Sequence, residues 1–176
     1  KQGWGWMCMT GTFAAVSAQK GLKMLQPNNI LDGDKGLWRM LAMDSFKEEL
    51  LTSTLGQKYY IEDFSSKMQP GCTTTHPALM AVEDLSKEHS ITVSDIERIE
   101  VITNYSESIG MEDQTPISLA DREFSTPYQV AAALVAGEPG PNWYTERTAN
   151  SREMLDMIKR VTLSFDEECE LAYRDQ

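Results

Sequence analysis

Helix-like and strand-like patterns interleave irregularly along this chain, and that irregular order limits the possible folds more than any other feature. Several segments carry apolar residues at helical spacing, whereas three short runs either alternate or are rich in β-type residues. The patterns predict helices at residues 4–25, 37–42, 45–55, 78–89, 127–136 (with Thr126 as the N-cap) and 151–159, and strands at residues 58–64, 97–104 and 160–165. Elements in this order are typical of an α+β fold, in which helices cover a small β-sheet.

The first predicted helix, residues 4–25, is apolar around much of its circumference. A helix of this kind is normally buried, so we expect it to belong to the core of a larger body. A length of 176 residues suits one domain, and we expect residues 1–176 to form a single α+β domain. Because the chain runs almost at once into this apolar segment, we also expect it to be a piece of a longer two-domain protein.

Composition excludes several classes of function. The net charge of −11 argues against nucleic-acid binding, which requires a basic face. We see no run of 18 or more apolar residues, so we expect no membrane span. The three cysteines are odd in number and far apart, which favours reduced thiols in a cytoplasmic protein.

One loop, residues 67–76, concentrates chemically useful side chains. It holds Lys67, Cys72 and His76 around the turn-forming pair Pro70-Gly71, between a predicted strand and a predicted helix. Loops held between rigid elements often carry function. The alternative is a plain strand-to-helix connection with a helix cap, and spacing alone does not separate the two.

Each side chain of this loop also has an alternative role. Lys67 could hold a carboxylate or be a surface lysine, and His76 could hydrogen-bond a carboxylate or cap its helix. Cys72 could be a small packing residue or half of a nucleophilic Cys–His pair. One Cys and one His are too few for a zinc site, so we expect no metal.

Four stretches of the sequence are informative when they are taken together. They are the Lys-Gly-Trp helix start at residues 1–6, the Gly-containing turn at residues 30–39, the loop at residues 67–76, and the helix start at residues 120–131. In this order, and over nearly the whole chain, they resemble the MmgE/PrpD family, which includes 2-methylcitrate dehydratase, cis-aconitate decarboxylase and iminodisuccinate epimerase.

The resemblance implies that this chain is the C-terminal lid domain of a cofactor-independent enzyme. Family reactions move a proton, water or carbon dioxide next to substrate carboxylates. The resemblance implies catalytic roles for Lys67 and His76, and substrate-binding roles for Lys1, Tyr105 and Cys72. Tyr105 follows a strand end, where ordinary loop packing is the alternative. For Arg122 we expect a structural ion pair rather than a substrate contact.

The same resemblance implies a cytoplasmic homodimer acting in propionate metabolism on a small di- or tricarboxylic acid. The family's acid/base aspartate and histidine lie in a helical domain and have no counterpart in this chain, so we expect the lid alone to be inactive. A different class remains open: a non-catalytic α+β module that binds a partner or dimerises.

Overall fold

The computed structural model describes residues 3–22, 36–41, 47 and 49–175. The chain divides into two compact units, Lys1–Ser65 and Ser66–Gln176. Whether the two units make one domain stays a prediction. Within the described residues, no helix combines the length and apolar character that crossing a membrane requires.

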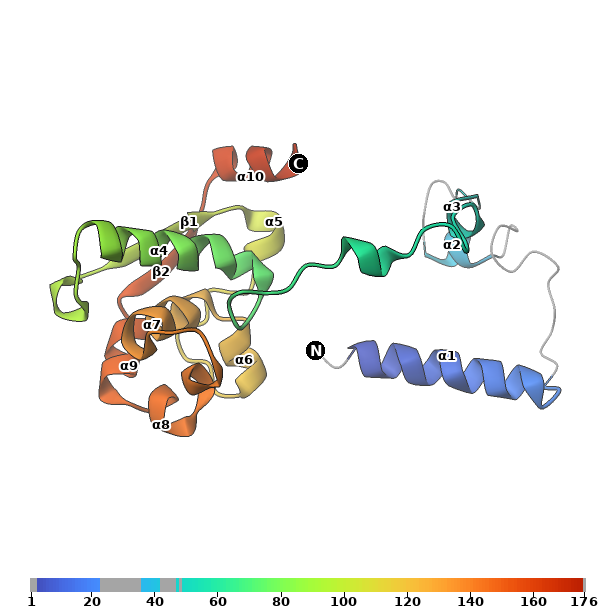
Figure 1. Ribbon diagram of the computed structural model, residues 1–176, viewed down its shortest axis with the longest axis horizontal. Coiled ribbons are helices and arrows are strands. Elements are labelled where there is room, and N and C mark those ends of the chain that lie inside the picture. The colour runs from blue at the N-terminus through green and yellow to red at the C-terminus, as the bar shows by residue number, and fades with distance from the viewer. Residues whose placement is uncertain (1–2, 23–35, 42–46, 48, 176) are drawn as a thin grey trace. The chain divides into compact units, whose positions relative to one another are not determined.

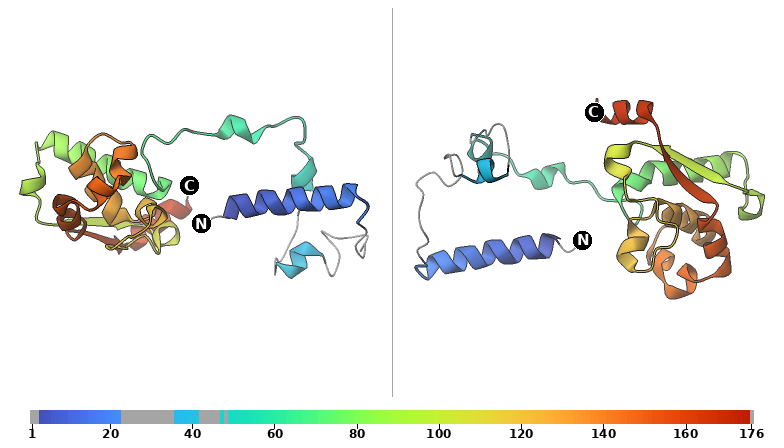
Figure 2. Two further views of the ribbon diagram at one scale, coloured as in Figure 1. Left: turned by 90° about the horizontal axis from the view of Figure 1, so that it is seen from below. Right: turned by 180° about the vertical axis from the view of Figure 1, so that it is seen from behind.

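Unit 1 contains the long helix α1 (Gly3–Gln19), followed by the short helices α2 (Leu37–Met40) and α3 (Glu49–Thr52) and a 3-10 turn at Tyr60–Asp63. Figure 2 shows α1 as one uninterrupted helix. The predicted burial of this helix was wrong for the chain described here, because Trp6 and Phe13 are 68% and 71% exposed. A Cβ added at Gly11 would meet nothing within 4 Å, so among the described residues nothing packs closely against this glycine.

The run at residues 58–64 was predicted to be a strand, and this was also wrong. Tyr60–Asp63 forms a 3-10 turn in which the Glu62 N–H donates to the Tyr59 carbonyl at 3.0 Å. Ile61 and Phe64 are exposed. Aromatic and β-branched residues favour strands where neighbouring strands give them a pleated, half-buried surface to pack on, and both strands among the described residues lie in unit 2.

Unit 2 is an α+β unit, as predicted, built around a parallel pair of strands (Figure 1). β1 (Ile99–Thr103) pairs with β2 (Val161–Phe165) in the register Ile99 to Val161 through Thr103 to Phe165. Parallel neighbours need a long crossover connection. Here it runs through α5 (Tyr105–Ser108), α6 (Leu119–Glu123), α7 (Thr126–Ala136), a 3-10 turn (Pro141–Tyr144), α8 (Glu146–Ala149) and α9 (Arg152–Ile158).

Helix α7 is the centre of this unit, packed against α4 (His76–Glu88), α9 and β2. Its first turns are fully buried. Ser125 caps it, since its Oγ accepts from the Tyr128 N–H at 3.0 Å, and Gly137 ends it with a positive φ of 68°. The core around α7 consists of Leu79, Tyr128, Val130, Ala131, Ala132, Trp143, Ala149, Met154, Met157, Ile158 and Val161.

Candidate functional site

The 67–76 loop belongs to unit 2 and leads directly into α4. Gly71 has a φ of 101°, a conformation that glycine adopts without strain. The Thr75 hydroxyl donates to the Cys72 carbonyl at 2.7 Å, which closes the 3-10 turn Thr73–Thr75. Pro77 lies in the first turn of α4, where its missing N–H costs little. The loop is therefore shaped by its own local sequence.

Lys67 is exposed and folds back over the loop. Its ammonium group donates to the Gly71 carbonyl at 2.8 Å. A lysine ammonium carries three donors, so two remain for another acceptor. The geometry thus presents a positive charge beside the loop.

His76 lies half-buried at the start of α4. The pKa of its imidazole is lower than that of a solvated histidine. Burial lowers its pKa most, the nearby Lys67 charge lowers it further, and a hydrogen bond to the Gln69 backbone raises it in part. Its Nε2 has no hydrogen-bond partner among the described residues. A neutral imidazole with a free ring nitrogen can accept a hydrogen bond or a proton there.

The helix-cap alternative for His76 was wrong. His76 is the first residue of α4, and the cap position belongs to Thr75, whose side chain makes no capping hydrogen bond. The orientation of His76 is therefore set by the loop and by burial rather than by the helix terminus.

Cys72 ties the loop to α6. Its N–H donates to the Glu123 carbonyl at 3.0 Å, and its thiol donates to the Thr74 hydroxyl at 3.4 Å. These contacts fit a structural role, and substrate binding by Cys72 stays a prediction. Lys1 lies outside the described residues. Among the described residues, no three His, Cys, Asp or Glu side chains are grouped so that they could hold a metal ion.

Tyr105 begins α5, directly after β1. Its ring packs edge-on against Phe165 with centroids 5.2 Å apart, and its N–H donates to Glu170 of α10 (Glu167–Arg174) at 2.9 Å. Ser106 also donates to this carboxylate through its hydroxyl and N–H, and these bonds are the main reason that the pKa of Glu170 falls to about 2. Tyr105 is firmly placed, and its substrate-binding role stays a prediction.

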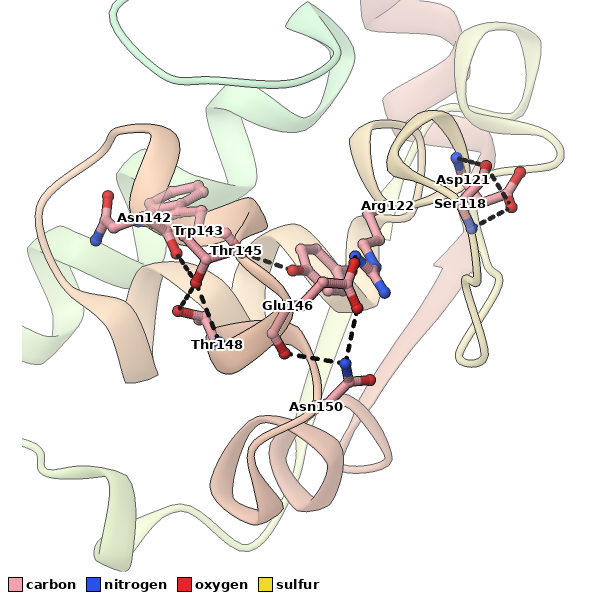
Figure 3. A network of polar contacts seen from close by, with 10 residues as sticks. Ser118, Asp121, Arg122, Asn142, Trp143, Thr145, Glu146, Thr148 and Asn150 are labelled. Atoms are coloured by element: carbon pink, nitrogen blue, oxygen red, sulfur yellow. Dashed lines mark hydrogen bonds and ion pairs between the residues drawn. The ribbon is translucent and has the colours of Figure 1, made fainter.

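Arg122 makes the structural ion pair that the sequence predicted. Its buried guanidinium donates to Glu146 at 2.9 Å, and Asn150 donates to the other oxygen of that carboxylate at 2.9 Å. Figure 3 shows these side chains converging from α6 and α8. The bond from Arg122 is the main reason that the pKa of Glu146 is lowered.

Sequence reasoning missed Gln129, a fully buried amide on α7. Its Nε2 donates to the Arg122 carbonyl at 2.9 Å and to the Tyr144 hydroxyl at 2.6 Å. The only signal in the sequence was one amide among the apolar residues of α7. Buried amides normally have specific partners, and here these partners lie on α6 and the turn before α8.

Two cavities lie near the loop, and Lys67 and His76 line neither of them. A cavity of about 300 Å³ has Thr74 and Thr75 in its wall, together with β1. A second, of about 400 Å³, includes Gln69 and lies along α4 and α7. A substrate site at Lys67 and His76 would therefore be an open surface of unit 2.

We expect the substitution Lys67→Ala to raise the pKa of His76, because it removes a positive charge that disfavours the imidazolium form. The pKa is measured from the imidazole signals in NMR spectra recorded across pH. The matched control is Lys87→Ala, which removes a lysine paired with Glu83 on α4. If Lys67→Ala and Lys87→Ala leave the His76 titration equally unchanged, the two loop residues are not electrostatically coupled.

Comparison with known proteins adds a family assignment for most of unit 2. Residues 70–176 match a family model described as the MmgE/PrpD C-terminal domain. No curated protein matches this chain. The matched region contains Cys72, His76 and Tyr105 and begins three residues after Lys67.

Proposed function

The chain belongs to the MmgE/PrpD family, and from that premise we propose that it forms part of a cofactor-independent lyase or isomerase. Its substrate would be a small di- or tricarboxylic acid such as 2-methylcitrate or cis-aconitate. The reaction would be dehydration, decarboxylation or epimerisation, with a helical domain supplying further acid/base groups. We propose a cytoplasmic homodimer in propionate metabolism as its setting.

The observation that carries this proposal is that Lys67 and His76 lie on one loop, where the Lys67 charge helps to lower the pKa of His76. The Lys67 ammonium has two donors left after its bond to Gly71, and these would hold a substrate carboxylate. The lowered pKa of His76 keeps its imidazole neutral, so that it would take a proton from the carbon next to that carboxylate. The cation would also stabilise the negative charge that develops there.

Calorimetric titration of citrate, 2-methylcitrate and cis-aconitate into the protein tests this assignment. We expect one acid to bind, and Lys67→Ala to weaken binding by at least about tenfold, or about 1.5 kcal/mol, as for the loss of a hydrogen bond to a charged group. Lys87→Ala serves as the control and should bind as the wild type does. Equal affinities for wild type and Lys67→Ala would remove Lys67 from the site.

A second function, partner binding without catalysis, is favoured by the exposed apolar face of α1. Trp6, Met7 and Phe13 are each more than 60% exposed, and large apolar patches on a protein surface commonly mark an interaction site. The same titration separates the two functions. A protein that binds none of the three acids supports the partner-binding function.

A further inference from the structure

Gln129 packs against Gly71 of the 67–76 loop, the residue to which the Lys67 side chain is hydrogen-bonded. Its amide occupies the space where a side chain at position 71 would lie: a Cβ there would be 2.7 Å from Oε1 and 2.9 Å from Nε2 of Gln129. Gly71 is also the residue whose carbonyl accepts from the Lys67 ammonium. The Gln129 side chain therefore packs against the backbone of Gly71, which accepts the hydrogen bond from Lys67.

The amide of Gln129 is itself fixed from the other side. Its Nε2 bonds to the Arg122 carbonyl and the Tyr144 hydroxyl, and both acceptors belong to the body of unit 2. Tyr144 stacks on Tyr128 with ring centroids 6.0 Å apart, while the Arg122 side chain is held by Glu146. A side chain anchored in this way cannot swing aside without losing two hydrogen bonds.

A second attachment lies one residue further along the loop. Cys72 donates its N–H to the carbonyl of Glu123, the residue after Arg122. The loop thus meets the end of α6 and the side chain of Gln129 at two successive residues, which fixes both its position and its direction.

We propose that Gln129 is a positioning residue: by packing against Gly71 it sets where the Lys67 ammonium stands relative to the His76 imidazole. A catalytic role for Lys67 and His76 in this arrangement rests on the proposed function. The positioning of Lys67 by Gln129 does not depend on that function. Gln129 acts through Gly71 and is not itself expected to touch a substrate.

A double-mutant comparison read out at His76 tests the inference. In the wild type, Lys67→Ala should raise the pKa of His76, whereas in a Gln129→Met background the same substitution should have a much smaller effect. The control background is Gln114→Met, which also removes a glutamine amide that donates to a backbone carbonyl, here that of Val161. In that background the effect of Lys67→Ala should persist in full.

The comparison needs folded proteins, which circular dichroism establishes, and the signal of His89 serves as the internal reference. A merely structural role for Gln129 would lower stability but leave the effect of Lys67 on a folded His76 intact, and this result would overturn the inference. If Gln129→Met does not fold, Tyr144→Phe removes one of the two anchors while keeping the ring. Tyr144→Phe should reduce the effect of Lys67→Ala on the pKa of His76. If that effect is unchanged, the inference is overturned.

The outcome is independent of whether the protein binds carboxylic acids. Loss of coupling in Gln129→Met without any ligand binding would uphold the positioning role and defeat the proposed function. If an acid binds but Gln129→Met leaves the effect of Lys67 on His76 unchanged, the proposed function is upheld and the positioning role is defeated.

Discussion

Replacing Trp143 with alanine should lower the free energy of unfolding of unit 2 by about 3–5 kcal/mol. The indole is fully buried in the core, and its Nε1 donates to the Gly137 carbonyl at 3.1 Å. The Trp143 carbonyl accepts from the buried Tyr128 hydroxyl at 2.6 Å, so a shift of this turn would also disturb α7. A loss of that size is a large part of the total stability of a domain.

Urea denaturation followed by far-ultraviolet circular dichroism measures this loss without relying on tryptophan fluorescence. Trp6→Ala is the matched control, because Trp6 is 68% exposed on α1 and its removal leaves no cavity. We expect a change within about 0.5 kcal/mol for the control, as for surface substitutions in general. Similar losses for the two variants would show that Trp143 is not a core residue.

The sequence was most informative where local signals and burial agree. The helices α4, α7 and α9 and the strands β1 and β2 were all predicted, and the alternating burial of β1 confirms its half-buried pattern. Pro127 and Gly137 mark the start and end of α7 within one residue. In these segments the local sequence signals and the apolar face favour the same element.

The predictions failed where structure depends on a partner surface. The run at residues 58–64 has strand-forming residues but pairs with no strand among the described residues, and local 3-10 hydrogen bonds form instead. The apolar character of α1 predicts burial, but a sequence pattern cannot supply the surface that would cover it. Local propensity is a weak prior when tertiary contacts are missing.

For the candidate site, the sequence identified the loop but not what holds it. Lys67 and His76 could be named from residue type and resemblance, and in the structure the Lys67 charge helps to lower the pKa of His76. The contact between Gly71 and Gln129 joins residues 58 positions apart in the chain, and no local pattern predicts such a pair. A buried amide becomes informative only after its neighbours are known.

Replacing Gly71 with alanine should destabilise unit 2 by about 2–5 kcal/mol, and for two separate reasons. At a φ of 101° any side chain is strained, which costs about 1–2 kcal/mol. The new methyl group would also lie 2.7 Å from Gln129 Oε1, and overpacking of this kind adds about 1–3 kcal/mol. Gln129 cannot yield easily, since its Nε2 is held by two hydrogen bonds.

Gly110→Ala separates the two causes. Gly110 has a similar positive φ of 81°, but a Cβ there would meet nothing within 4 Å. The control should therefore lose only the backbone term, about 1–2 kcal/mol, in the same urea denaturation experiment. Equal losses at both glycines would mean that Gln129 gives way without cost. A larger loss at Gly71 would show that the Gln129 amide resists displacement, as the proposed positioning of Lys67 through Gly71 requires.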